Sequence, residues 1–160
     1  MIIWLLIAQM AIPPEFAPAV LNATVHVQQD KGRWTYTICN NEAGFQIMTF
    51  QFEKIDVRQA LVEPPVGWRA SMYPDRTGVI FGGGYIRQGQ CVSSEIKVNP
   101  NIEVGQVRYW MQATSEEDLK KFKTDPQGAR REAQERPKDI NEIAKRSKLL
   151  WGQIDGPVSK

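Results

Sequence analysis

The sequence predicts an all-β fold, an antiparallel β-sandwich of about seven strands, followed by a helical C-terminal extension. Between residues 22 and 113, apolar and polar residues alternate with period two, and turn residues interrupt the alternation at short intervals. The links between the runs are too short for helical crossovers, which favours antiparallel pairing. After residue 113 the chain becomes rich in charged residues and poor in aromatic ones. A β-barrel fits the same alternation and stays open as the alternative.

The clearest expected strand is residues 33–40, where Trp34, Tyr36 and Ile38 occupy one face and polar residues or cysteine occupy the other. A tight Asp-Lys-Gly turn precedes it, so the run before the turn forms a hairpin with it. The seven expected strands are residues 23–29, 33–40, 45–54, 69–72, 79–81, 91–98 and 104–113.

Composition limits the classes of protein that this chain can represent. It has 160 residues, of which 42% are hydrophobic, enough for one packed domain and too many for a wholly disordered chain. Its 20 basic and 18 acidic residues balance too closely for a protein whose main ligand is nucleic acid. No apolar run reaches the roughly 18 residues of a transmembrane helix, so none is expected.

The N-terminal residues 1–19 read as a signal-peptide-like apolar segment. The first twelve residues are nearly all apolar, Pro13 and Pro14 follow, and Ala17-Pro18-Ala19 is a small-x-small pattern that a signal peptidase accepts. No Lys or Arg precedes the apolar run, which is atypical of such signals. We expect an exported protein, periplasmic, extracellular or at the cell surface, with a mature start near Val20. The alternative is a buried N-terminal strand or an arm packed on a partner.

Cys39 and Cys91 are the two cysteines, and each lies in an expected strand. In an exported chain two cysteines most often form a disulfide. Closing this loop would stabilise the fold by about 4 kcal/mol in the chain-entropy model. Two buried free thiols are the alternative. No C-x-x-C motif is present, which argues against redox catalysis and zinc binding.

Residues 115–160 are expected to form a charged helical extension. Ser115 followed by three acidic residues is a typical helix start, and Leu119 and Phe122 give that helix a short apolar stripe. A second short helix is expected at residues 129–135, before Pro137. Asp139 would cap a third helix, whose apolar face consists of Ile140, Ile143, Ala144, Leu150, Trp151 and Ile154.

Two interpretations of the third helix carry equal weight. It covers a sheet face or an edge strand, which sandwiches must protect, or it offers Ile143, Leu150 and Trp151 to a protein partner. A helix lying on a membrane surface is disfavoured, because the segment is nearly neutral.

Residues with catalytic or metal-binding chemistry are sparse. His26 is the single histidine, and no nucleophile-elbow motif exists for a His-based triad. Gly82-Gly83-Gly84 lacks the Gly-Lys-Ser/Thr of a phosphate loop and more simply predicts a wide turn or a β-bulge. The acidic residues near loops show no paired pattern; they are Glu53, Asp56, Glu63 and Asp75. We therefore expect no enzymatic activity, no cofactor and no metal.

Trp34, Trp68 and Trp110 suggest a second function, a carbohydrate-binding module with a stacking platform. Core positions are the favoured interpretation for all three. Trp68 follows Gly67 in a turn-like context, so it is the one candidate for an exposed glycan-binding side chain.

Several features between residues 22 and 113 resemble those of exported bacterial immunoglobulin-like or cohesin-like sandwich domains. They are Trp34-Thr35-Tyr36 leading to Asn40, Pro65-Val66-Gly67-Trp68, Val79-Ile80-Phe81, Ile86-Arg87-Gln88-Gly89 and the strand at residues 91–98. This resemblance implies a binding or scaffolding module without an active site.

The functional expectation follows from these observations together. Residues 20–114 would form an immunoglobulin-like sandwich that serves as a non-enzymatic accessory subunit of a cell-envelope or extracellular assembly. It would bind a protein partner through its sheet faces and the C-terminal helix, and a glycan is the alternative ligand.

Overall fold

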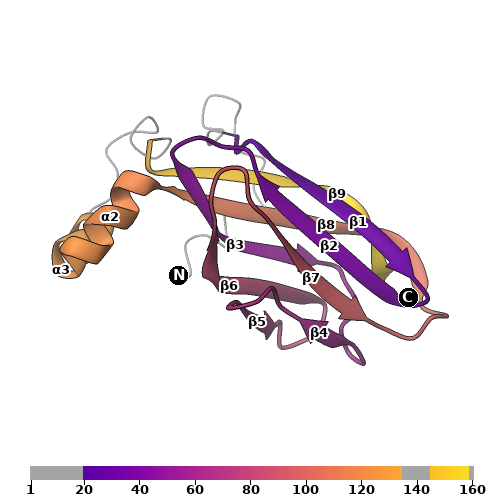
Figure 1. Cartoon of the computed structure of the whole chain (residues 1–160). Helices are drawn as coiled ribbons and strands as arrows, with labels where there is room; N and C mark the ends of the chain where they lie inside the picture. Colours follow the sequence, from indigo (N-terminus) through magenta and orange to yellow (C-terminus); the bar gives the residue numbers. More distant parts are fainter. Residues whose placement is uncertain (1–19, 135–144, 159–160) are drawn as a thin grey trace, which may run out of the picture.

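The computed structural model describes residues 20–134 and 145–158, and it consists mainly of two antiparallel sheets (Figure 1). The first sheet has four strands in the order β1 (Ala23–Asp30), β2 (Arg33–Asn40), β7 (Cys91–Lys97) and β4 (Leu61–Glu63). The second has five strands in the order β5 (Arg69–Met72), β6 (Gly78–Ile86), β3 (Phe45–Glu53), β8 (Glu103–Ser115) and β9 (Ser147–Val158). Two helices, α2 (Glu116–Thr124) and α3 (Pro126–Gln134), lie beyond one end of the sheets.

All seven expected strands are confirmed, with ends that differ by a few residues. The alternation in β2 separates its faces as expected, because Trp34, Tyr36 and Ile38 are buried while the residues between them are partly exposed. The structure adds two strands that the sequence did not predict, the three-residue β4 and the long β9.

Buried side chains from both sheets form one hydrophobic core. Aromatic rings dominate its centre: the rings of Tyr36 and Phe52 lie 4.3 Å apart, and those of Phe50 and Phe81 lie 4.7 Å apart. Tyr36 comes from the four-stranded sheet and the three phenylalanines from the five-stranded sheet. Burial of these rings is the main force that holds the two sheets together.

The predicted third helix is wrong over residues 147–154, which belong to β9. β9 pairs with β8 along its whole length, with Leu150 opposite Met111 and Ile154 opposite Val107. A spacing of four residues satisfies both the helical period of 3.6 and the strand period of two, and pairing with β8 decides between them. Lys145 and Arg146 are helical. The rest of that prediction, including Asp139, Ile140 and Ile143, lies outside the described residues.

The two predicted helices that precede this segment are confirmed. The Ser115 hydroxyl accepts a hydrogen bond from the main-chain N–H of Asp118 across 3.2 Å, which is the expected N-cap. The main-chain N–H of Glu116 also donates to the Gly44 oxygen across 2.9 Å. These two bonds fix the start of α2 against the end of the five-stranded sheet.

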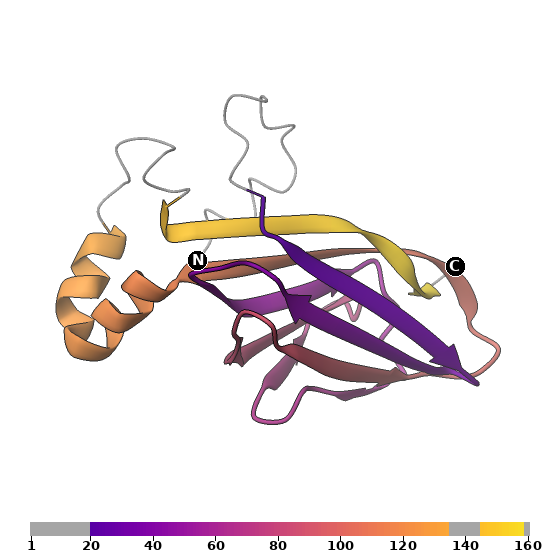
Figure 2. The ribbon, with the colours of Figure 1, turned by 45° about the horizontal axis from the view of Figure 1, so that its top comes forward.

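The free edge of β9 is closed at three points by other parts of the chain. Val20 pairs with Leu149 in a parallel bridge, and Figure 2 shows the indigo start of the described chain crossing beside the yellow β9 strand. Further along, the Tyr36 hydroxyl donates to the Asp155 oxygen and the Asp56 N–H donates to the Pro157 oxygen. These contacts shield the edge from adding a foreign strand.

The disulfide between Cys39 and Cys91 is confirmed. The two cysteines are directly opposed in the β2–β7 register, so the bond joins neighbouring strands of one sheet. Within the described residues, no helix is long and apolar enough to cross a membrane.

Candidate functional site

The two described residues of the expected partner-binding set lie on opposite faces of β9. Leu150 packs against the hydrophobic core, whereas Trp151 is 57% exposed. A strand alternates its side chains, so neighbours in sequence cannot share one face. Leu150 is therefore a core residue, and Trp151 alone of the two faces outward. Ile143 lies outside the described residues.

The structure resolves the roles expected of the other tryptophans. Trp34 is buried, and Trp68 is only 7% exposed, with its ring 5.3 Å from that of Phe50. The favoured core position is therefore confirmed for Trp34 and Trp68. The alternative, an exposed and glycan-binding Trp68, is wrong, because the ring turns inward onto the phenylalanine cluster. Trp110 also departs from the expected core position, since it is partly exposed on the outer face of β8.

Trp110 and Trp151 form a pair on the outer face of the five-stranded sheet, in which Trp151 is exposed and Trp110 is partly exposed. They are directly opposed in the β8–β9 register, as are Gln112 and Leu149 two residues further along. Directly opposed side chains on one face of an antiparallel pair lie within contact range. We call the surface made by Trp110, Trp151 and Leu149 the tryptophan face.

Polar and charged groups surround the tryptophan face. Arg108 forms an ion pair with Glu53 across 3.0 Å, and Gln106 bonds to Asp155. Gln153 on β9 is exposed. The apolar centre is thus bordered by polar groups, the arrangement typical of protein interfaces.

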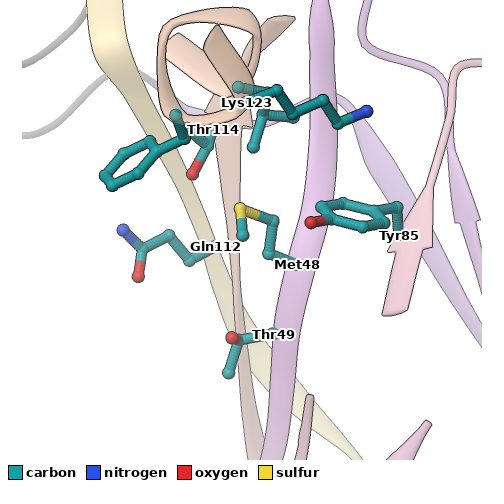
Figure 3. A pocket seen from close by; sticks show the side chains of 8 residues that line it. Met48, Thr49, Tyr85, Gln112, Thr114 and Lys123 are labelled. Atoms are coloured by element: carbon teal, nitrogen blue, oxygen red, sulfur yellow. The ribbon is translucent and has the colours of Figure 1, made fainter. Parts of the chain in front are cut away.

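A pocket of about 510 Å³ lies beside the tryptophan face, between the sheet and α2 (Figure 3). Residues from β3, β6, β8 and α2 line it: Met48, Thr49, Tyr85, Gln112, Thr114, Leu119, Phe122 and Lys123. In Figure 3, Met48 lies centrally, with Gln112 and Tyr85 on opposite sides of it. Gln112 belongs to the pocket and is also the register partner of Leu149, so the two surfaces adjoin.

A β-bulge creates this pocket. The register of β3 shifts between Ile47 and Thr49 against both of its neighbours, which takes Met48 out of the regular ladder. Opposite the shift runs Gly82-Gly83-Gly84, where Gly83 has a φ of +92°, a conformation that side-chain-bearing residues rarely adopt. β6 continues through the glycine run, so the wide turn is wrong, and the register shift opposite the run fits the expected β-bulge. Met48 and Thr49, at this shift, line the pocket.

Lys123 is the only charged residue that lines the pocket. Its neighbour Lys121 forms ion pairs with Glu117 and Glu132, whereas Lys123 forms none within the described part of the chain. The pocket therefore combines apolar walls with hydroxyl and amide groups and a single cation at its edge.

The acidic residues considered for catalysis are engaged in separate local contacts. Glu53 pairs with Arg108, and Glu63 pairs with Lys97 across 2.6 Å. Hydrogen bonds from Arg58 hold the pKa of the Asp56 carboxyl below its usual value, and those from Thr77 do the same for Asp75. The structure does not bring these four carboxylates together as a pair across a cleft.

His26 is exposed on β1, on the face opposite to Val25 and Val27, as its position in the alternation predicts. Among residues 20–134 and 145–158, no three side chains of His, Cys, Asp or Glu gather as metal ligands.

Sequence reasoning named Trp151 as a partner-binding residue but missed its pairing with Trp110, and it missed the pocket. Trp110 and Trp151 are 41 residues apart in the chain, and only the β8–β9 pairing brings them together. The glycine run was a partial signal, because it predicted an irregularity in this part of the sheet, where β3 shifts its register.

No family model matches the chain, and no curated protein does. One solved structure, titled "AvmM Catalyzes Macrocyclization in Alchivemycin A Biosynthesis", is 8% identical, and the alignment covers 94% of this chain and 86% of that one. Its TM-score is 0.28. That value is too low to assign either a fold or an activity.

Proposed function

We propose that this chain is an exported, non-enzymatic interaction protein with an immunoglobulin-like β-sandwich fold, an accessory subunit of a cell-envelope or extracellular assembly. It binds a protein partner through the tryptophan face of the five-stranded sheet. The observation that carries the proposal is Trp151, a large aromatic side chain that is 57% exposed and directly opposed to a second tryptophan.

The strand pairing supports an immunoglobulin-like arrangement. In that fold the second strand pairs with the fifth in one sheet, while the third, sixth and seventh form the other. Here β2 pairs with β7, and β3, β8 and β9 are neighbours in the second sheet. This matches the pattern when β7, β8 and β9 are counted as the fifth, sixth and seventh strands, with β5 and β6 as additional strands beside β3. The disulfide departs from the antibody pattern, because it joins two strands of one sheet instead of the two sheets.

Export is supported by the disulfide, since such bonds persist mainly in oxidising compartments. The apolar residues 1–19 agree with it. Mass spectrometry of the native protein tests this step directly. A mature N-terminus near Val20 supports export by a cleaved signal, and an intact Met1 contradicts it.

The chemistry of the tryptophan face supports a protein ligand. Tryptophan is among the residues most enriched at the energetic centres of interfaces, because it buries a large area with little loss of side-chain entropy. The Arg108–Glu53 pair and Gln153 would form the polar rim that surrounds such centres.

Photo-cross-linking tests the proposal in native cells. Benzoylphenylalanine replaces Trp151 in one variant and the fully exposed loop residue Val66 in a matched control. We expect a defined adduct from position 151 and none from position 66, with the captured protein identified by mass spectrometry. Absence of an adduct at position 151, or the same adduct at both positions, contradicts the proposal.

Binding to the purified partner then measures the contribution of the indole. Trp151→Ala should weaken affinity by at least about tenfold, the effect expected of an interface hot spot. Val66→Ala should leave affinity unchanged. Equal affinity for both variants would remove Trp151 from the interface.

Carbohydrate binding is the second candidate, and exposed Trp151 with Gln153 beside it now favours it in place of Trp68. Sugars stack on exposed aromatic rings and form hydrogen bonds with flanking amides. A glycan array distinguishes the two candidates: binding that Trp151→Ala abolishes supports a carbohydrate ligand, and a blank array leaves the protein partner.

A further inference from the structure

We propose that the pocket between α2 and the β3 bulge binds an amphipathic carboxylic acid, with its alkyl chain against Met48, Leu119 and Phe122 and its carboxylate at Lys123. This site is separate from the proposed protein interface, although the two adjoin at Gln112.

The pocket is a half-open hollow with the volume of a small-molecule site, and Tyr85 and Phe122 stand at its open side with 48% and 43% of their surface exposed. Its volume of about 510 Å³ falls inside the range of roughly 300–1,000 Å³ that is usual for such sites. Apolar groups dominate the walls: Leu119 and Phe122 belong to α2, and Figure 3 shows Met48 in the centre with Tyr85 to one side. An alkyl chain would bury its apolar surface against these walls and displace water from them, which favours binding.

Local structure forms the pocket in advance of any ligand. The Ser115 N-cap and the bond from Glu116 to Gly44 fix α2 at the end of β8. Leu119 is almost fully buried and joins the helix to the sheet. On the other side, the register shift in β3 places Met48 and Thr49 at the floor of the pocket. Binding a ligand would therefore cost little free energy for ordering the residues of this site.

The charge pattern selects an anion. Lys123 is the one charged group among the lining residues, and no acidic side chain lines the pocket. The acids of the first turn of α2 have other contacts: Glu116 bonds to Gln46, and Glu117 pairs with Lys121. The hydroxyls of Thr49 and Thr114 supply further hydrogen-bond donors for carboxylate oxygens. The Gln112 amide already donates one hydrogen bond, to the Ser147 hydroxyl across 3.1 Å.

A planar carboxylate on an alkyl chain satisfies both parts of this lining. A cationic amphiphile would meet Lys123 with like charge, and a neutral alcohol would gain the apolar walls without the charge-assisted hydrogen bond. The three head groups therefore separate the charge contribution from simple hydrophobic uptake.

Titration of the full-length protein with sodium decanoate below its micelle concentration tests the site. The Met48 methyl resonance is followed by NMR, and decanol and decyltrimethylammonium serve as comparison probes. We expect a saturable shift of that resonance with decanoate, affinity at least about threefold weaker with decanol, and none with the cation. No saturable shift, or equal affinity for all three probes, overturns the proposal.

Three variants locate the binding groups. Lys123→Gln should weaken decanoate binding about three- to tenfold and leave decanol binding unchanged, and Phe122→Ala should weaken both. Lys120→Gln is the matched control, because Lys120 is an exposed lysine of α2 outside the pocket lining. Equal loss in Lys120→Gln and Lys123→Gln would show a general charge effect and contradict the site. Phe122 and Lys123 are exposed, so these substitutions leave the fold intact.

The test is independent of the proposed interface. Loss of the partner in Trp151→Ala with unchanged decanoate binding would separate the two surfaces. If decanoate binds but cross-linking at position 151 gives no adduct, the pocket proposal holds and the protein-interaction proposal is contradicted.

Discussion

The phenol of Tyr36, in the four-stranded sheet, donates a hydrogen bond to the main-chain oxygen of Asp155 in the five-stranded sheet across 3.2 Å. The two residues are 119 positions apart in the chain. This bond joins the last strand to the centre of the core, where the Tyr36 ring packs on Phe52. It is one of the contacts that make β9 part of the fold.

Tyr36→Phe keeps the ring and removes this bond. We expect the free energy of unfolding to fall by about 1 kcal/mol at neutral pH, the usual net contribution of one hydrogen bond. Chemical denaturation followed by circular dichroism measures the change. An unchanged midpoint would show that water replaces the phenol at Asp155 without loss.

For Tyr36→Phe we also expect a difference from the wild type in how stability changes at high pH. Burial of the Tyr36 phenol, and then the nearby Asp155 carboxylate, raise its pKa well above its usual value near 10. Above about pH 10 the unfolded chain loses this proton while the folded chain keeps it, so stability decreases as pH rises. Tyr36→Phe should therefore lose stability less steeply than the wild type between pH 10 and 11. If the stability of Tyr36→Phe and of the wild type falls equally steeply over this pH range, the raised pKa of Tyr36 is contradicted.

The seven expected strands were predictable because their alternation is local. In β2, three apolar residues at period two can occupy only one face of a strand, whatever the rest of the chain does. The helix start at Ser115 was equally local, because a serine followed by acidic residues in the next turn predicts an N-cap without information from elsewhere in the chain.

β9 and the candidate site were not predictable in this way. Leu150 and Ile154 fit a helix and a strand equally well, and the twelve-residue pairing with β8 is information from elsewhere in the chain. Trp68 looked like a turn residue, and its burial depends on the space left by Gly84 in β6. The pocket needs the register shift in β3, Tyr85 of β6 and α2 together, which no single stretch of sequence shows.

Gly84→Ala should destabilise the fold through its contact with Trp68. A Cβ at position 84 would lie 2.0 Å from the indole nitrogen of that buried ring, which has no room to retreat from Phe50. We expect a loss of about 1–3 kcal/mol, typical of overpacking in a core, measured by thermal and chemical denaturation.

Gly82→Ala is the control for this effect. A Cβ at position 82 meets its nearest atom, the Met48 oxygen, at 3.8 Å, which is ordinary contact. Its stability should stay close to that of the wild type. If both variants lose the same stability, the cause is the loss of glycine from the strand and not the contact with Trp68.

Glu42→Gln tests the contact that ties β9 to the start of the described chain. The Glu42 carboxylate accepts bonds from the Lys148 ammonium at 2.5 Å and from the Asn22 N–H at 2.8 Å. Partial burial acts to raise the pKa of Glu42, but these two bonds outweigh it and hold the pKa below its usual value. The folded state thus favours the ionised form, which stabilises the fold above the unfolded pKa of about 4.3.

This stabilisation is lost as pH falls through the lowered pKa of Glu42. Glu42→Gln should be less stable than the wild type at pH 7 by roughly 1–3 kcal/mol, with the difference shrinking below about pH 4. Denaturation curves across this pH range measure the effect. Glu103→Gln is the control, because Glu103 is exposed and makes no ion pair within the described residues. A difference between Glu42→Gln and the wild type that stays constant with pH would contradict the role of the charge.

Leu150→Ala and Trp151→Ala together distinguish a strand from a helix at the end of the chain. In β9 the Leu150 side chain packs into the core opposite Met111, so its truncation should cost roughly 1–3 kcal/mol. Trp151 faces outward, so Trp151→Ala should change stability by less than about 1 kcal/mol while it weakens binding to the proposed partner. On the helix that the sequence suggested, the two residues share one apolar face and would respond alike. Comparable losses of stability in the two variants, measured by chemical denaturation, would therefore contradict the pairing of β9 with β8 and with it the tryptophan face.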